Sequence, residues 1–214
     1  MTYWHCFAAC VMAYFLGSIP SAIWYGEAYH GIDVRKHGSG NAGATNTFRV
    51  LGKTAGSIVL FIDVLKGWTA TMLAHILFFM NLLEIQNVLA VQLMLGFIAV
   101  LGHLFSIFTK FKGGKGVATA LGMIIAVQPN VAAACVGVFL LCLVAFHYVS
   151  LSSIVASFMF PTLLAAGVFG KSSPLLIGFG FMLFAIVFIK HYPNIIRIMN
   201  GSENRIYLFK KQNK

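Results

Sequence analysis

Long apolar runs separated by short polar segments dominate this sequence and most constrain how it can fold. Seven runs can be distinguished, at about residues 4–25, 58–80, 88–108, 117–127, 131–149, 154–169 and 175–189. A helix needs about 20 residues to cross the hydrocarbon core of a bilayer, and two or three of these runs are too short to do so alone. The pattern predicts an all-α integral membrane protein with seven transmembrane helices, some of them short. Five full spans, with some segments merged or half-inserted, is the alternative.

The composition excludes the other broad classes of protein. Apolar residues make up 59% of the 214 residues and charged residues only 9%, whereas a soluble domain carries about 25% charged residues. A soluble fold of this size could not hide so much apolar surface, and a disordered chain would contain far less of it. We therefore expect one polytopic membrane domain over residues 1–214.

The net charge of +10 lies almost entirely on one side of the predicted topology. Fourteen of the fifteen Lys and Arg residues fall in or beside three regions, at about 27–53, 102–119 and 190–205, or in the tail with Lys210, Lys211 and Lys214. Whether the chain has seven or five spans, these regions face the same side, and the opposite connections contain only Lys171. Basic loops stay in the cytoplasm. The distribution predicts an external N-terminus, a cytoplasmic C-terminus and three cytoplasmic motif regions, and it argues against a nucleic-acid partner.

The first region contains a glycine-rich motif, GSGNAGATNTFR, at residues 38–49. It matches G-x-G-x-x-G, but a dinucleotide site needs a preceding strand, and here a predicted membrane helix and a polar loop precede it. Glycines still let backbone amides approach an oxyanion, and a helix N-terminus adds partial positive charge. The alternatives are an anion site or a flexible loop with ordinary helix capping. The candidate binding residues are Gly38, Ser39, Gly40, Asn41, Thr45, Asn46 and Arg49.

The second region contains KGGKGVAT at Lys112–Thr119. It resembles a P-loop, but Thr109 stands where the first glycine is needed and Gly116 stands where Ser or Thr should follow the lysine. A glycine cradle around a lysine at the start of an apolar helix is still a good anion site. A cytoplasmic anchor would explain Lys110 and Lys112, but it would not explain the glycines around Lys115. The pattern therefore favours Gly113, Gly114, Lys115 and Gly116 as binding residues.

The third region places His191, Asn194 and Arg197 three residues apart, followed by Glu203. On a helix these first three side chains would share one face. The alternative is an interfacial helix that ends the last span, with Arg197 on lipid headgroups.

Ionisable residues also occur inside the apolar runs. Asp63 and Lys66 lie in the second run, where a charged residue is a functional candidate by default. Their i,i+3 spacing permits a mutual ion pair, so a structural bridge is the preferred interpretation. His103 ends the third run, and a hydrogen-bonded or capping role and a contact with substrate are both open.

Obvious general bases and metal ligands are scarce. The residues five positions after the seven histidines include no acid, which excludes the H-x4-D pattern of many acyltransferases. The cysteines lie in apolar runs without metal-site spacing, so we expect neither a disulfide nor a metal or other cofactor. Many donors and few bases favour a phosphate-rich substrate that brings its own leaving group.

Together, the motifs resemble those of the acyl-phosphate-dependent glycerol-3-phosphate acyltransferase (PlsY) family of bacterial membranes. The resemblance covers nearly the whole chain. It rests on GSGNAGATN with Arg49, Asp63-x-x-Lys66-Gly67, Gly102-His103, FKGGKGVAT, and His191-x-x-Asn194-Ile195-x-Arg197 with Gly201-x-Glu203. One departure is Ser106, where the family usually has proline, and it leaves the bend after His103 open.

The resemblance implies a seven-helix fold in the bacterial cytoplasmic membrane, with the active site facing the cytoplasm. It implies transfer of an acyl group from acyl phosphate to the 1-hydroxyl of sn-glycerol 3-phosphate, giving lysophosphatidate and phosphate in the first acylation of phospholipid synthesis. The donor phosphate would take the proton from the attacking hydroxyl. Membrane lipid and a soluble enzyme that makes acyl phosphate are the implied partners.

The resemblance also implies which residues act. The catalytic set lining the phosphate sites would be Ser39, Arg49, Lys115, His191 and Asn194, with His103, Arg197 and Glu203 added to the glycine-motif residues as substrate-binding candidates. The alternative function is a transporter of a phosphorylated solute. It predicts polar residues across the membrane, and apart from Asp63 and Lys66 the runs contain few.

Overall fold

The computed structural model describes residues 2–207, and over this range the chain forms helices and connecting segments without a β-strand. The all-α prediction is therefore confirmed for the described part of the chain. The chain divides into two compact units, Met1–Pro129 and Asn130–Lys214, and one polytopic domain stays a prediction. Lys210, Lys211 and Lys214, which the charge argument placed in a cytoplasmic tail, lie outside the described residues.

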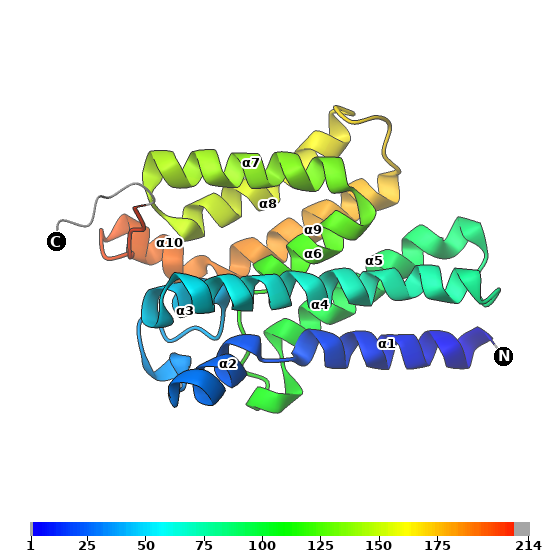
Figure 1. The fold of residues 1–214 in the computed structure, drawn as a ribbon. Helices are drawn as coiled ribbons and strands as arrows, with labels where there is room; N and C mark the ends of the chain where they lie inside the picture. Colours follow the sequence, from blue (N-terminus) through cyan, green and yellow to red (C-terminus); the bar gives the residue numbers. More distant parts are fainter. Residues whose placement is uncertain (1, 208–214) are drawn as a thin grey trace. The chain divides into compact units, whose positions relative to one another are not determined.

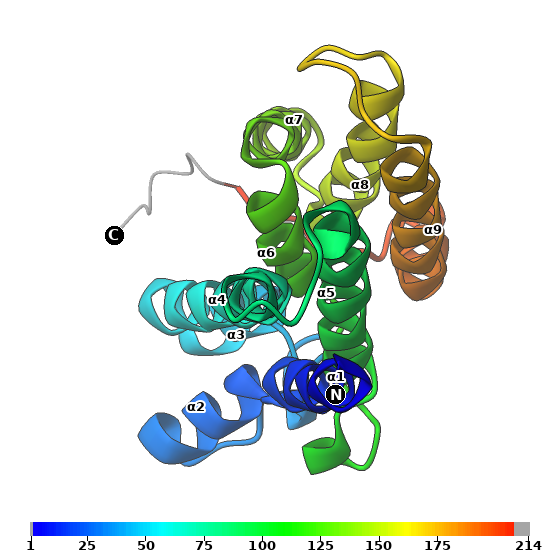
Figure 2. The same ribbon diagram turned by 90° about the vertical axis from the view of Figure 1, so that its right-hand side faces the viewer.

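The first unit is a bundle of long helices with two short helices at one end. Its helices are α1 (Thr2–Ser18), α2 (Ser21–His30), α3 (Ala44–Leu51), α4 (Lys53–Phe79), α5 (Val88–Leu104) and α6 (Val117–Val127), with 3₁₀ turns η1 (Val34–Lys36), η2 (Ile85–Asn87) and η3 (Ile107–Thr109). Helices α1, α4 and α5 lie side by side, and α6 packs on α4 and α5 (Figures 1 and 2). Buried alanines fill much of the space between α1, α4 and α5, because small residues let membrane helices approach closely.

Glycine sets the distance between α4 and α6. A Cβ on Gly67 of α4 would collide with the carbonyl of Thr119, and a Cβ on Gly122 of α6 would collide with the carbonyl of Val64. The two backbones therefore touch at two places along the helices. Since α6 directly follows the second glycine-rich motif, this contact fixes the end of that motif against α4.

The first apolar run is not the continuous segment predicted over residues 4–25. Pro20 has no N–H to donate and cannot continue a helix, so α1 ends at Ser18 and α2 begins at Ser21, at an angle of 45°. The break exposes backbone carbonyls inside the first unit. The Ile19 carbonyl accepts a hydrogen bond from Nζ of Lys66 at 2.9 Å, and the Ser18 carbonyl accepts one from the hydroxyl of Ser106.

The second unit begins at the second residue of α7 (Pro129–Phe146) and also contains α8 (Val149–Ala165), α9 (Pro174–Lys190) and α10 (Tyr192–Met199). Helices α8 and α9 pack together, and α10 contacts both. The chain bends by 55° between α9 and α10. Beyond α10 it returns toward the start of α8, where the backbone N–H of Ile206 donates to the carbonyl of His147 at 2.8 Å. The third motif region, at about residues 190–205, is thereby folded around the start of α8.

Each of the seven predicted apolar runs overlaps a helix. Within the described residues, three segments are long and apolar enough to cross a membrane, namely α4, residues 85–109 around α5, and α7; counting each bent pair as one span raises the number to five. Helices α6 and α8, with 11 and 17 residues, are the shorter apolar helices. Seven full spans and the orientation of the termini stay predictions.

Candidate active site

Asn46 organises the loop of the first glycine-rich motif. Its side chain is 1% exposed, and Nδ2 donates to the carbonyls of Val34 at 2.8 Å and His37 at 3.1 Å. Its Oδ1 accepts from the backbone N–H of Ser39 at 2.8 Å and from the Ser39 hydroxyl at 3.1 Å. Gly38 lies against this amide with φ of +62°, a region that favours glycine. Asn46 is thus used inside the loop, where it holds the exposed Ser39 in place.

Helix α3 follows this loop directly and carries Arg49. The helix begins after Gly43, whose carbonyl accepts from the hydroxyl of Thr47 at 3.2 Å. A Cβ on Gly56 of α4 would collide with the ring of Phe48, so α3 packs tightly on α4. Arg49 is half-buried near the end of α3. Asn41 and Thr45 are half-buried on either side of Gly43, at the start of the helix.

The glycine loop of the second motif, residues 113–116, runs against the last turn of α5. The backbone N–H groups of Gly113 and Gly114 donate to the carbonyls of Leu104 and His103, both at 3.2 Å. A Cβ on Gly113 would collide with the His103 carbonyl, and one on Gly114 would collide with the His103 imidazole. Gly116 adopts φ of +80° immediately before α6. These contacts account for the three glycines that membrane topology left unexplained.

The three lysines of the second region differ in their surroundings. Lys115 is half-buried between two buried glycines at the start of α6, whereas Lys110 and Lys112 are exposed. The first turn of a helix directs backbone N–H groups outward. Lys115 therefore stands beside a favourable place for an anion.

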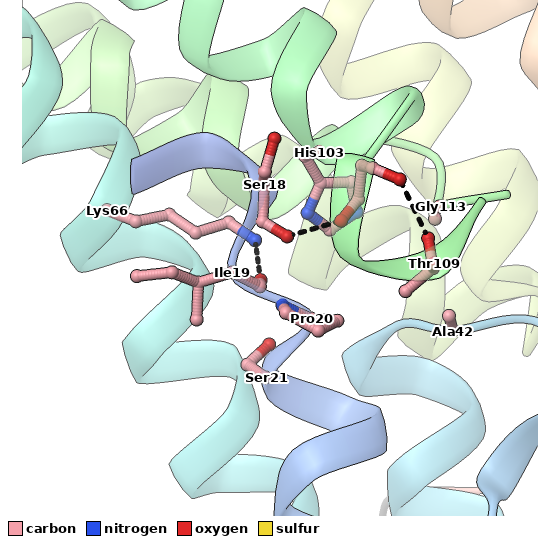
Figure 3. A pocket seen from close by; sticks show the side chains of 11 residues that line it. Ser18, Ile19, Pro20, Ser21, Ala42, Lys66, His103, Thr109 and Gly113 are labelled. Atoms are coloured by element: carbon pink, nitrogen blue, oxygen red, sulfur yellow. Dashed lines mark hydrogen bonds between the residues drawn. The ribbon is translucent and has the colours of Figure 1, made fainter. Parts of the chain in front are cut away.

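The two glycine-rich motifs meet at one end of the first unit. A pocket there is lined by Ala42 of the first motif, by Gly113 and Gly114 of the second, and by Lys66, His103 and residues of the α1–α2 break (Figure 3). The first and second motifs therefore approach each other at Ala42, Gly113 and Gly114.

A buried ion pair forms part of the wall of this pocket, with Lys66 in the lining. Nζ of Lys66 is 2.8 Å from Oδ1 of Asp63, with their side chains 3% and 1% exposed, and the same carboxylate oxygen accepts from the hydroxyl of Ser21 at 2.7 Å. The predicted i,i+3 bridge is confirmed. His103 is buried beside it, with Nδ1 at 3.2 Å from the hydroxyl of Thr119 and 3.7 Å from Oδ1 of Asp63.

His191 occupies the bend between α9 and α10 in the second unit. It is 3% exposed, and its Nδ1 lies 2.8 Å from the carbonyl oxygen of Val187. A carbonyl can only accept, so Nδ1 carries the proton of this hydrogen bond. In the neutral ring, Nε2 then has the lone pair.

Glu203 gathers the polar side chains of the third motif. Its Oε1 accepts from Nδ2 of Asn194 at 2.7 Å and from the hydroxyl of Ser150 at 2.9 Å, and its Oε2 accepts from Nε of Arg197 at 2.8 Å. Burial acts to raise the pKa of Glu203, but these hydrogen bonds outweigh it and hold the pKa below its ordinary value of 4.5. Glu203 therefore holds Asn194 and Arg197 against α8. Ser150 was not predicted, because a serine inside an apolar run carries no signal of a distant partner.

The donors of the site suit an anion. Residues 2–207 contain no group of three or more His, Cys, Asp or Glu side chains that could hold a metal ion. The four cysteines, Cys6, Cys10, Cys135 and Cys142, are free thiols. The polar groups of the three motif regions are mainly hydroxyls, amides and cationic side chains, together with the imidazole of His191 and the carboxylate of Glu203.

Comparison with known proteins agrees with this chemistry. Residues 7–201 match the family model for glycerol-3-phosphate acyltransferase. The chain belongs to the glycerol-3-phosphate acyltransferase family. It is similar to the glycerol-3-phosphate acyltransferase of Salinibacter ruber, with 40% identity over 216 residues that cover 96% of this chain and 94% of the relative.

Two solved structures resemble the fold. Both are of PlsY, an integral membrane glycerol 3-phosphate acyltransferase, and both share 34% identity with this chain. The glycerol 3-phosphate form has a TM-score of 0.79 and covers 96% of this chain and 99% of its own. The lysophosphatidic acid form has a TM-score of 0.76, with coverages of 94% and 95%. The family resemblance of the motifs is thus confirmed: the protein is a bacterial membrane acyltransferase, and the transporter alternative is set aside.

Glu203 should make stability depend on pH in the acid range. Because its pKa is lower in the folded protein than the ordinary 4.5, the ionised carboxylate stabilises the fold above that value, and the contribution is lost as the pH falls through the folded pKa. Glu203→Gln should cost about 1–3 kcal/mol at neutral pH and should show a smaller further loss in acid than the wild type. Thermal unfolding in detergent from about pH 7 to about pH 3 measures this.

The exposed Glu84 provides the control, since Glu84→Gln should follow the wild-type curve throughout. An acid-dependent loss in Glu203→Gln equal to that of the wild type would contradict the assignment.

Proposed function

We propose that this acyltransferase takes its acyl group from acyl phosphate and transfers it to the 1-hydroxyl of sn-glycerol 3-phosphate, releasing lysophosphatidate and inorganic phosphate. The observation that carries the proposal is the pair of adjacent glycine-rich motifs in the first unit, each with one half-buried cation, Arg49 or Lys115. Two phosphate-bearing substrates require two sets of donors. The related PlsY was solved in glycerol 3-phosphate and lysophosphatidic acid forms, which supports the same acceptor and product here.

The catalytic residues of this proposal are Ser39, Arg49, Lys115, His191 and Asn194. Ser39 is an exposed hydroxyl donor held by Asn46. The amides of Gly113 and Gly114 are already bonded to α5, so the amides at the start of α6, from Gly116 onward, are the better candidates for phosphate. Side-chain and backbone donors from Gly38, Gly40, Asn41, Thr45 and Gly116 add to this set. Asn46 supports Ser39 within the first unit, and Glu203 holds Asn194 and Arg197 within the second.

The proposed reaction needs little from a protein base. The glycerol 3-phosphate hydroxyl attacks the acyl carbonyl, a new C–O ester bond forms, and the C–O bond to phosphate breaks. Phosphate is a good leaving group and can take the proton that the hydroxyl loses. Arg49 and Lys115 would stabilise the phosphate charges, so positioning and electrostatics carry the rate. His191 would orient the substrate.

The same proposal includes the membrane arrangement. The acyl chain would lie between helices or in lipid, while both phosphates bind at the cytoplasmic surface. Seven spans, an external N-terminus and a cytoplasmic C-terminus place the three basic motif regions in the cytoplasm. A soluble enzyme that makes acyl phosphate could then deliver the donor from the same side.

The choice of donor tests the function directly. Purified protein given acyl phosphate should release inorganic phosphate only when glycerol 3-phosphate is also present, and lysophosphatidate should appear in equal amount. Acyl-CoA should not support turnover, because its nucleotide has no recognition element in the motifs. Comparable rates with acyl-CoA would overturn the donor assignment.

Lys115 and Arg49 should carry the phosphate chemistry. Losing a charge-assisted hydrogen bond to a partly desolvated phosphate should cost about 2–4 kcal/mol of transition-state binding, so Lys115→Ala and Arg49→Ala should slow turnover roughly 30- to 1,000-fold. The exposed Lys110 and Lys112 are matched controls, and their alanine variants should stay near wild type. Full activity in folded Lys115→Ala would remove the site assignment.

His191→Ala separates two mechanisms. If the donor phosphate takes the proton and His191 only orients the substrate, the rate loss should be similar at every pH. If His191 is instead a general base, the wild-type rate should change with pH as a single histidine titrates, and this change should be missing in the variant. Finding that pH dependence would refute the substrate-assisted mechanism.

The orientation can be tested by labelling single cysteines in a cysteine-free background. A cysteine placed beside Lys171 should react with an impermeant reagent added outside intact cells. One placed beside Lys112 should react only after permeabilisation. The reverse pattern would place the motifs outside the cell and would be incompatible with cytoplasmic substrates.

A further inference from the structure

His103 contacts the glycine loop, residues 113–116, with both its backbone and its ring. Its carbonyl accepts the N–H of Gly114 at 3.2 Å, and its Nε2 lies so close to the Gly114 α-carbon that a Cβ there would collide with it. In Figure 3 the His103 side chain lies near Ser18, where α1 ends. His103 therefore packs directly against the loop that contains Lys115.

The same imidazole also contacts the segment after Lys115. Its Nδ1 is 3.2 Å from the hydroxyl of Thr119, which is fully buried in the first turn of α6. Gly114 and Thr119 flank Lys115 in the sequence, so one ring touches the chain on both sides of the proposed catalytic lysine. Moving the ring would move the whole segment.

The ring lies against the buried ion pair. Oδ1 of Asp63 lies 3.7 Å from Nδ1 of His103, and Asp63 is held by Lys66 at 2.8 Å and Ser21 at 2.7 Å. Lys66 donates to the Ile19 carbonyl at 2.9 Å. Buried charges that satisfy each other resist displacement, because separating them leaves an uncompensated charge in a medium of low polarity. The loop is thus connected through His103 to α4 and to the α1–α2 break.

We propose that His103 is a positioning residue that holds the Lys115 segment in its phosphate-binding geometry and does not contact the substrate. Its side chain is only 7% exposed, and both ring nitrogens face protein groups. The inference rests on the proposed function, in which Lys115 binds a substrate phosphate. The buried Asp63–Lys66 pair lies beside the imidazole.

A rescue experiment tests this assignment. Gly114→Ala should raise the KM for a phosphate substrate roughly tenfold or more, because the new methyl group displaces the loop from His103. Adding His103→Ala should remove the colliding ring and restore part of the lost kcat/KM. The recovery should be partial, since the added Cβ would still lie 3.0 Å from the Ala42 carbonyl.

Gly113 supplies a matched control one residue away. A Cβ on Gly113 would collide with the His103 backbone carbonyl instead of its ring. His103→Ala leaves that carbonyl in place, so it should not rescue Gly113→Ala. A general change in stability would affect both glycine variants alike, whereas loop positioning predicts rescue of one only.

His103→Asn keeps a polar group near Thr119 and removes the ring atom that faces Gly114. It should also rescue Gly114→Ala, and it serves in place of His103→Ala if the alanine variant does not fold. Hydrogen exchange of residues 113–119 should be faster in His103→Ala than in the wild type. A direct substrate contact would instead give losses that add in the double variant, without rescue, and with unchanged exchange.

Lys115→Ala separates failure of this inference from failure of the proposed function. If Lys115→Ala stays active, the phosphate site itself is wrong. If Lys115→Ala is inactive but the His103 and Gly114 effects add independently, only the positioning role is overturned. Rescue of Gly114→Ala and no rescue of Gly113→Ala supports the positioning role.

Discussion

The ion pair between Lys66 and Asp63 is the interaction on which the first unit depends. A proline break inside an apolar bundle leaves carbonyls without helical partners, and in a membrane each such group must find an internal partner. Lys66 donates to the Ile19 carbonyl, and Asp63 balances its charge and accepts from Ser21. The break can therefore exist where it does, and the chain turns from α1 into α2 toward the first glycine-rich motif.

Close backbone contacts hold the second glycine-rich motif against the long helices of the first unit. Gly67 and Gly122 bring α4 and α6 together, while Gly113 and Gly114 bring the loop onto the end of α5. Each contact leaves no room for a side chain, so Lys115 is presented by a segment held on two sides. In the second unit a carboxylate holds the motif region in place, since Glu203 accepts hydrogen bonds from donors on both α8 and α10.

The sequence predicted most of the helices, but few of the contacts between them. The apolar runs predicted the helices, and residues 117–127 matched α6 to the residue, because a glycine and a proline bound that run closely. The proline break at residue 20 was missed, since hydropathy continues across it. The glycines around Lys115 signalled a special site, yet the reason for Gly113 and Gly114, their approach to His103, is a tertiary contact. Asn46 and Glu203 were selected as candidates for substrate, and only the folded geometry indicates that their side chains bind other protein groups.

The return of the chain after α10 has a consequence for how the integrity of this protein is judged. Asn194 and Arg197 lie on α10, but the carboxylate that holds them belongs to the segment beyond that helix. A shortened chain ending at Asn200 would retain every helix from α1 to α10 and still lack that partner. Its circular dichroism spectrum would be almost unchanged while the third motif had lost its order. Helix content and active-site order are therefore separate properties of this enzyme, and a measurement of the first says little about the second.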